Sequence, residues 1–250
     1  QDPLRIPMGP RHMARPGGYF ESMTRPLAPY ACRGVIWYQG ESDNEEGRER
    51  YFAASTRAVI ASWRALWQRP EMPFLMVQLA PFSHWLHTTG EYYPILRAQQ
   101  QQVADSDPNV WVTCIMDAGE AENIHPVHKR PVGTRLALLA RGKVYGEDIL
   151  CQSPSLCDAE RTGHVIRLHL SPCGSGLYAA PGIPHPLALI VEGISVPIDH
   201  IDIQGDTVTL TAAELAGRPC EVRYAWENYT VGSLYNSAGL PVFPFRVSLD

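Results

Sequence analysis

Short apolar runs separated by amphipathic stretches organise the first part of the chain and predict three buried strands with helices between them. The runs are rich in β-branched and aromatic residues and cover residues 34–38, 74–79 and 110–116. Phe52, Val59, Trp63 and Leu66 recur at helical spacing, which predicts a helix over residues 45–68. Further helices are expected over residues 94–104 and from Pro131 onward. This β-α-β alternation implies a parallel sheet with right-handed crossovers.

The pattern changes near Gly146. Short strand-like runs then follow one another, separated by Gly, Pro and Asp turns, over residues 165–170, 187–191, 208–210 and 220–225. Gly205-Asp206 is typical of a hairpin turn. We therefore expect an α/β domain over residues 1–148 and an all-β module over residues 149–250, with residues 1–33 forming an irregular approach to the first strand.

Polar residues follow the first predicted strand at once, in the order Gln39-Gly40-Glu41-Ser42-Asp43. In open α/β sheets, ligands bind just beyond the carboxyl ends of the strands. Gln39 offers an amide N–H donor, Gly40 permits close approach or a sharp turn, and Glu41 can orient a neighbouring group. A plain strand-to-helix loop with a carboxylate near the helix N-terminus would explain the same residues without catalysis.

A second polar loop follows the third predicted strand and contains His125. A general base for acyl transfer needs a pKa near neutrality and one fixed tautomer, and a carboxylate three residues earlier, Glu122, can accept the far ring N–H. A structural histidine in a loop is the competing interpretation. The pair His84 and His87 lacks a third ligand at suitable spacing, so no metal site is expected. Its loop, with Tyr92-Tyr93, is a candidate wall of a sugar pocket instead.

Three ordered motifs together resemble one known family. Residues 34–43, GVIWYQGESD, are similar to the third conserved block of the SGNH hydrolases, in the form found in the sialate O-acetylesterase family and related acetylxylan esterases. Residues 117–126, DAGEAENIHP, with Lys129 and Val132-Gly133, resemble that family's fifth block, which holds the catalytic histidine. A third similarity, to the family's C-terminal end, comprises Arg223-Tyr224-Ala225-Trp226, Leu234-Tyr235-Asn236, Gly239-Leu240-Pro241 and Pro244-Phe245-Arg246.

This resemblance implies a flavodoxin-like three-layer SGNH hydrolase domain, with its N-terminal part missing, followed by the small all-β module. It also implies a serine carboxylic-ester hydrolase with His125 as general base and a Gln39 side-chain N–H in the oxyanion hole. Glu122 is the expected acid, and Gly40, Glu41 and Asn123 are expected at the substrate. The chain departs from the usual pattern, because the family commonly has Asp where Glu122 stands, so Asp117, Glu120 or a backbone carbonyl remain alternative partners.

No segment of the chain resembles the family's serine block, a Gly-Gln-Ser-Asn-like turn near the start of its catalytic domain. Ser22 lacks the preceding strand and glycine, and Ser42 lies inside the third block. We therefore expect an N-terminal segment or a second chain to supply the serine. The expected function is hydrolysis of acetyl esters on carbohydrates, with O-acetylated sialic acid as the leading substrate. The alternatives are an acetylxylan or other polysaccharide acetylesterase, and a non-catalytic carbohydrate-binding or scaffold protein.

Composition and charge exclude some classes of binding partner. The 250 residues have 45% hydrophobic and 19% charged positions, as ordinary globular proteins do, and a formal net charge of −5. Neither nucleic acid nor a membrane is expected as a partner, because there is no basic excess and no membrane-length apolar run. No cofactor is expected. The compartment is undetermined, with export favoured; Cys151, Cys157, Cys173 and Cys220 are then candidates for disulfides of unknown pairing.

Overall fold

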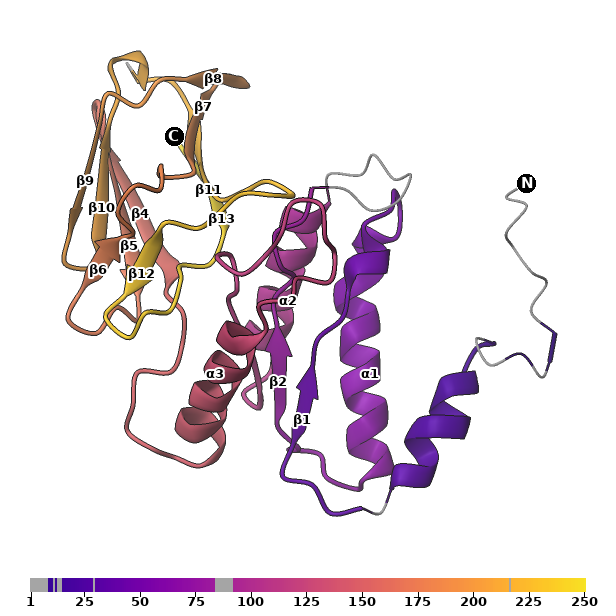
Figure 1. The fold of residues 1–250 in the computed structure, drawn as a ribbon. Coiled ribbons are helices and arrows are strands. Elements are labelled where there is room, and N and C mark those ends of the chain that lie inside the picture. The colour runs from indigo at the N-terminus through magenta and orange to yellow at the C-terminus, as the bar shows by residue number, and fades with distance from the viewer. Residues whose placement is uncertain (1–8, 11, 13–14, 29, 84–91, 216) are drawn as a thin grey trace.

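Three short parallel strands form the sheet around which the helices pack (Figure 1). A computed structural model describes residues 9–10, 12, 15–28, 30–83, 92–215 and 217–250. The strands β1 (Val35–Trp37), β2 (Phe74–Val77) and β3 (Val110–Thr113) lie in the order β1-β2-β3. Both pairings are parallel, as the β-α-β alternation predicted.

Helices cover both faces of this sheet, which is why its strands are apolar without alternation. Phe74 and Met76 of β2 belong to one core cluster, which also holds buried residues of α1 (Phe52–Leu66) and α2 (Tyr93–Asp105). Leu75 and Val77 point to the other face, into a second cluster with α3 (Arg130–Leu139). The predicted mixed α/β class is confirmed, and its helices and strands alternate along the chain as expected.

The helix after β1 begins later than the sequence pattern predicts. Two 3₁₀ turns, Glu41–Asp43 and Glu49–Tyr51, precede it, and the α-helix starts at Phe52 rather than at Glu45. Gly47 between the turns has φ +82°, a left-handed conformation that interrupts a right-handed helix. The remaining short helical segments are Phe20–Thr24, Arg25–Leu27, Ala140–Val144 and Ala213–Leu215.

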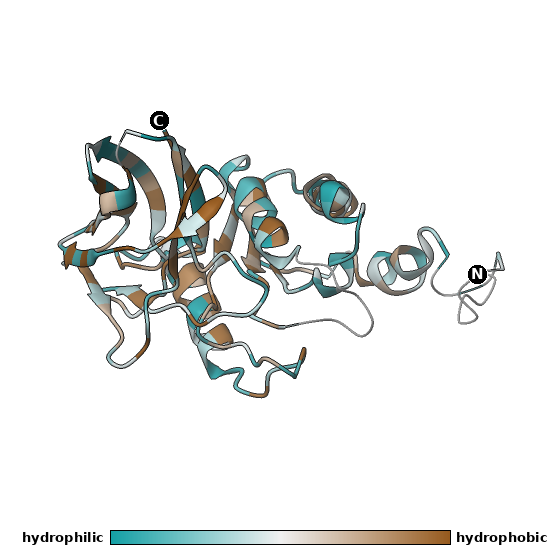
Figure 2. Cartoon of the chain, turned by 90° about the horizontal axis from the view of Figure 1, so that it is seen from above, coloured by the Kyte–Doolittle hydropathy of each residue, from teal (hydrophilic) through white to brown (hydrophobic). Residues whose placement is uncertain are grey.

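Antiparallel strands make up the rest of the chain and are grouped in three small sheets. The first has the order β4-β5-β10-β9, the second β13-β11-β7-β8 and the third β12-β6. The strands are β4 (Ser155–Thr162), β5 (Val165–Ser171), β6 (Leu177–Ala179), β7 (Leu187–Val191), β8 (Ile194–Val196), β9 (His200–Gln204), β10 (Thr207–Thr211), β11 (Cys220–Tyr224), β12 (Leu234–Asn236) and β13 (Phe245–Leu249). Gly205-Asp206 joins β9 to β10, so the predicted hairpin turn is confirmed. Hydrophobic and hydrophilic residues alternate along these strands (Figure 2), as expected of sheets with one buried face.

The two parts of the chain share a core and are joined by hydrogen bonds. One cluster contains Val112 of β3 and Met116 shortly after it, together with Leu168 and Leu189 of the antiparallel sheets. The Gly232 N–H donates to the Met116 carbonyl over 3.0 Å. The loops after the parallel strands are therefore braced from the C-terminal part of the chain. All six cysteines have free thiols, and no helix of the described residues is long and apolar enough to cross a bilayer.

Candidate active site

The loop after β1 turns sharply at Gly40. This residue has φ +144°, and an added Cβ would lie 2.9 Å from the Phe52 ring and 3.3 Å from Leu79. A glycine is required here for both conformation and space. Just before it, the Gln39 side chain is exposed, and its amide nitrogen donates to the Asp43 carboxylate over 3.2 Å. Since an amide has two N–H groups, this bond orients Gln39 and leaves one donor for a ligand.

The loop after β3 is held in shape by side chains on either side of His125. The Asn123 carboxamide oxygen accepts from the His125 backbone N–H over 3.0 Å, and its nitrogen donates to Glu120 over 3.1 Å. Glu120 in turn accepts from the Val127 N–H over 2.7 Å. Asn123, expected at the substrate, therefore also positions the backbone of the histidine loop.

The segment that follows β2 packs against the loop after β3. An added Cβ on Gly119 would lie 2.2 Å from the Pro81 carbonyl oxygen, so the two segments are in direct contact. The Ser83 N–H donates to the Ala121 carbonyl over 3.0 Å. The loops after β2 and β3 consequently form one continuous surface.

The His125 ring is exposed and makes no hydrogen bond within the described part of the chain. Glu122 is also exposed, and its carboxylate likewise has no partner among the described residues. No hydrogen bond joins the two, so the role of Glu122 as the orienting acid stays a prediction.

Asp117, one of the alternative acids, is hydrogen-bonded to groups other than His125. Asp117 accepts two hydrogen bonds from Arg135, of 2.6 and 2.7 Å, and one from the Tyr235 hydroxyl of 3.3 Å. Burial opposes the charge of Arg135, but the hydrogen bond and charge of Asp117 outweigh it and raise the pKa of the guanidinium. Asp117 thus anchors α3 and β12 to the end of β3.

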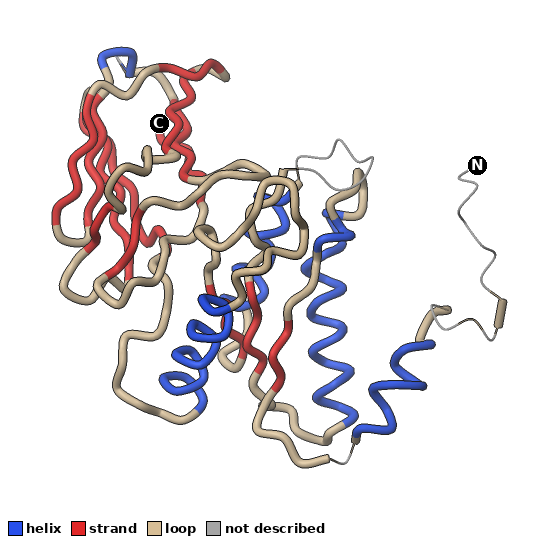
Figure 3. The backbone as a smooth tube through the Cα atoms, viewed as in Figure 1, coloured by secondary structure: helices blue, strands red, loops and turns tan. Residues whose placement is uncertain are grey.

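The loops after β1 and β3 lie at the same edge of the sheet because the strands are parallel. Figure 3 shows these segments as loops beyond the ends of the strands. A direct contact joins them: the Lys129 ammonium lies 5.4 Å from the centroid of the Tyr38 ring. Burial, and then the charge of Glu41, raise the pKa of Tyr38 to about 12, against the opposing charge of Arg97. Tyr38 therefore stays a neutral phenol facing a cation.

Arg97 of α2 is the structurally important residue that the sequence pattern did not single out. Its side chain is fully buried and donates to four carbonyls: Leu79 at 2.9 Å, Ala80 at 3.1 Å, Glu227 at 2.7 Å and Asn228 at 2.8 Å. Burial lowers the pKa of this guanidinium to about 10. Arg97 thereby ties the exit of β2 to the C-terminal part of the chain. The sequence feature that could have identified Arg97 is its position on the apolar face of α2, one turn after Tyr93.

Two further expectations concern aromatic and metal-binding groups. Tyr93 is completely buried and its hydroxyl has no partner among the described residues, so it packs inside the domain and does not line an open sugar pocket. The segment containing His84 and His87 lies outside the described residues. Within the described ranges, no group of three His, Cys, Asp or Glu side chains is placed to hold a metal ion.

Comparison with known proteins identifies the class to which this sheet and its two loops belong. Residues 17–139, which contain both loops, match a family described as carbohydrate esterase, sialic acid-specific acetylesterase. The solved structure of a carbohydrate acetylesterase from Xanthomonas citri superimposes with a TM-score of 0.80 and 32% identity, covering 89% of this chain and 52% of that one. The fold of this chain is therefore shared with a solved carbohydrate acetylesterase.

Within that class, the chain is similar to two sialate O-acetylesterases. The human sialate O-acetylesterase is 27% identical over 264 residues, covering 90% of this chain and 48% of that protein. The rat sialate O-acetylesterase is 32% identical over 145 residues, covering 51% of this chain and 26% of that protein. The chain thus spans about half the length of the human relative and about a quarter of the rat relative. The family resemblance seen in its motifs is confirmed.

Proposed function

We propose that this chain takes part in hydrolysis of O-acetyl esters on carbohydrates, with O-acetylated sialic acid as the leading substrate. The observation that carries the proposal is the Lys129–Tyr38 contact of 5.4 Å, which links the glutamine loop to the histidine loop at one sheet edge. The names of the family and of its human and rat relatives support the substrate class. A polysaccharide acetylesterase is the alternative within the same chemistry, and the name of the Xanthomonas citri neighbour, a carbohydrate acetylesterase, is compatible with both.

In the proposed mechanism, His125 accepts the proton of a serine hydroxyl as the serine oxygen attacks the acetyl carbonyl. The Gln39 N–H group that is not bonded to Asp43 donates to the oxyanion that forms, a contribution typically of about 10²–10³ in rate. The carbonyl re-forms, the bond to the sugar oxygen breaks, and His125 returns the proton to that oxygen. Water then attacks the acyl-enzyme by the same proton transfers, with Glu122 orienting the imidazole, and Gly40 and Glu41 lining the site.

The serine is proposed to come from a segment or chain outside these 250 residues. Every serine of the chain lies in the described ranges, and none is hydrogen-bonded to the His125 ring. The edge of β1 away from β2 has no partner strand among the described residues, and Ile36 on β1 is 65% exposed. A further parallel strand beside β1 would bring its own carboxyl end to the edge occupied by Gln39. This completed sheet corresponds to the proposed flavodoxin-like SGNH arrangement.

A second candidate function is carbohydrate binding without catalysis. The specific observation favouring it is the exposed His125 ring, which has neither a serine nor a carboxylate partner in the described chain. The two functions differ in whether a covalent intermediate forms.

A fluorophosphonate probe, which reacts with activated serines, separates these possibilities. The chain is treated with the probe alone and together with any polypeptide that co-purifies with it, and the labelled peptide is identified by mass spectrometry. The esterase proposal predicts labelling on a serine outside residues 1–250, and unchanged labelling in Ser83→Ala and Ser42→Ala. Labelling of Ser83 or Ser42 would contradict the external serine, whereas no labelling in any mixture would favour the binding protein. Acetate release from O-acetylated sialic acid and from acetylated xylan then ranks the substrates.

A further inference from the structure

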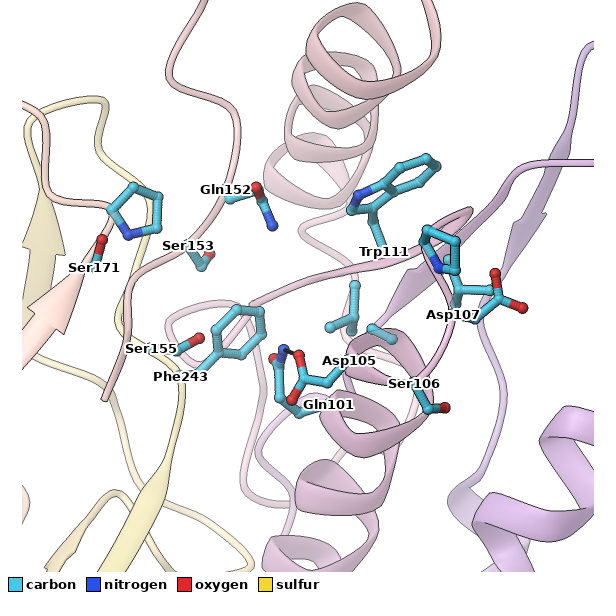
Figure 4. A pocket seen from close by; sticks show the side chains of 15 residues that line it. Gln101, Asp105, Ser106, Asp107, Trp111, Gln152, Ser153, Ser155, Ser171 and Phe243 are labelled. Carbon is cyan, nitrogen blue, oxygen red and sulfur yellow. Dashed lines mark hydrogen bonds between the residues drawn. The ribbon is translucent and has the colours of Figure 1, made fainter. Parts of the chain in front are cut away.

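The side chains that can act on an acyl group lie at the edge of the sheet where the parallel strands end. A groove of about 390 Å³ lies at the opposite edge, where residues 105–108 precede β3 and Phe243 adds to its wall (Figure 4). Because Gln39 follows β1 and His125 follows β3, this groove is separate from the candidate active site. Groups that assist the site therefore belong to the loops at the strand ends.

Asp43 is the acidic residue of the loop after β1 whose carboxylate contacts Gln39. The Gln39 amide nitrogen donates to it over 3.2 Å, and no Lys, Arg or His is ion-paired with Asp43 in the described part of the chain. By comparison, Glu45 in the same loop is paired with Arg48 over 2.7 Å. Gln39 is therefore the only side chain that Asp43 binds among the described residues.

Backbone hydrogen bonds fix the position of Asp43 on both sides. It is the last residue of the 3₁₀ turn Glu41–Asp43, and its N–H donates to the Gly40 carbonyl over 3.0 Å. Its own carbonyl accepts from the Glu45 N–H over 2.8 Å. The turn thus presents the carboxylate, four residues after Gln39, from a hydrogen-bonded backbone.

The contact with Asp43 decides which end of the Gln39 amide is directed at a substrate. The oxygen and NH₂ ends of a carboxamide have nearly the same size, so packing alone does not distinguish them. An ionised carboxylate accepts hydrogen bonds and cannot donate, so only the NH₂ end can face Asp43. The second N–H of that group then stays free. In the reversed amide, an acceptor oxygen would lie where the free N–H now points.

The negative charge of Asp43 opposes an oxyanion, so any benefit to the reaction comes from orientation. Water screens this repulsion, because Gln39 is exposed and Asp43 is partly exposed. A reversed amide, in contrast, replaces a donor beside the oxyanion with an acceptor, and one such donor is typically worth about 10²–10³ in rate. The effect of orientation therefore exceeds the effect of charge.

We propose that Asp43 is a positioning residue for the reaction, which keeps an N–H of Gln39, rather than the amide oxygen, directed at the acyl group. Asp43 itself touches neither the substrate nor the reacting atoms. The inference rests on the proposed esterase function, since the oxyanion that Gln39 would bind forms only in acyl transfer.

The kinetics of acetate release from O-acetylated sialic acid, by this chain with any polypeptide that co-purifies with it, test this role. Asp43→Asn keeps the size of the side chain but can donate as well as accept, so both orientations of the Gln39 amide become possible. We expect kcat to fall about 3- to 10-fold with KM nearly unchanged, because the oxyanion is absent from the bound substrate. Asp43→Glu keeps an acceptor and should recover most of the kcat. Ser42→Ala, at an exposed residue of the same turn, should match the wild type.

A double variant distinguishes orientation of the amide from damage to the loop. If Asp43 acts through Gln39, the variant Gln39→Ala/Asp43→Asn should have the kcat of Gln39→Ala alone, since no amide remains to be turned. The side-chain NH₂ resonances of Gln39 in the ¹⁵N-labelled chain, assigned with Gln39→Ala, give a measurement without substrate. They should shift in Asp43→Ala and stay unchanged in Ser42→Ala.

Three results would each overturn the inference: a wild-type or faster kcat in Asp43→Asn, a further loss of kcat in the double variant, or unshifted Gln39 resonances in Asp43→Ala. Failure of the proposed function has a different signature. The wild type would then release no acetate, and the inference would fail with it, while the Gln39 resonances would still shift in Asp43→Ala.

Discussion

The Lys129 ammonium lies over the Tyr38 ring, 5.4 Å from its centroid, and connects two loops that are about ninety residues apart in the chain. Tyr38 immediately precedes Gln39, and Lys129 lies four residues after His125. A cation over an aromatic face is a short-range interaction, so it holds the loop that contains Gln39 close to the loop that contains His125. The proposed site depends on this closeness of the two loops.

Replacing Lys129 should therefore slow catalysis without unfolding the protein. Exposed cation–π contacts contribute modestly, so Lys129→Gln should lower kcat for acetate release about 2- to 5-fold, and Lys129→Arg should retain most of it. Lys143→Gln, an exposed lysine after α3, is the matched control. Equal kcat for Lys129→Gln and wild type would remove this contact from the account.

Gly40→Ala should destabilise the fold, since φ +144° is strained for any side chain and the new Cβ would lie 2.9 Å from Phe52. Strain of this kind costs about 1–3 kcal/mol. Gly133→Ala is the control, because that glycine is in α3 with nothing within 4 Å of an added Cβ, and it should stabilise by about 0.5–1 kcal/mol. Urea unfolding of both variants checks that the free energy of unfolding falls in Gly40→Ala and rises in Gly133→Ala. A change of the same sign in both variants would be inconsistent with the Gly40 geometry.

Arg97→Leu should be among the most destabilising single substitutions in the chain. It removes four hydrogen bonds and leaves the carbonyls of Leu79, Ala80, Glu227 and Asn228 without this donor. We expect a loss of about 3 kcal/mol or more in the free energy of unfolding. Arg57→Leu, an exposed position on α1, should change it by less than about 1 kcal/mol. Similar urea midpoints for the two variants would show that Arg97 does not brace the two parts.

The Arg64–Asp107 pair should make stability depend on pH in one direction. The hydrogen bond from Arg64 lowers the pKa of Asp107 below its usual value, and partial burial opposes this only in part. A depressed carboxyl pKa stabilises the folded state above the unfolded-state value of about 4, and that contribution is lost as the pH falls through the folded-state pKa. Asp107→Asn should thus be less stable than wild type near neutral pH, with the difference shrinking below about pH 4. Urea unfolding at several pH values checks this, and a difference that does not shrink below about pH 4 would contradict the role of this ion pair.

The parallel sheet and its two loops could be predicted because their information is local. Buried strands between two helical layers are continuous apolar runs, and their polar ends follow directly in the sequence. The antiparallel part was harder. Strand β4, Ser155–Thr162, is mostly exposed and polar, so its pairing with β5 comes from backbone hydrogen bonds that no hydrophobic pattern reveals.

The site residues divide in the same way. Gln39 and His125 could be named from their positions after strands, whereas the role of Arg97 depends on carbonyls of Glu227 and Asn228 about 130 residues away. Asp117 was one of the alternatives for the acid, and only the folded chain shows that Arg135 and Tyr235 bond its oxygens.

Acetate release from O-acetylated sialic acid, compared between His125→Ala and His128→Ala, tests the central claim most directly. Both histidines are exposed in the same loop, so loss of a ring from the surface is matched between the two variants. The assay uses this chain together with any polypeptide that co-purifies with it. His125→Ala should lower kcat by about 10³-fold or more, while His128→Ala stays near wild type. Wild-type turnover by His125→Ala would contradict the assignment of this imidazole as the general base.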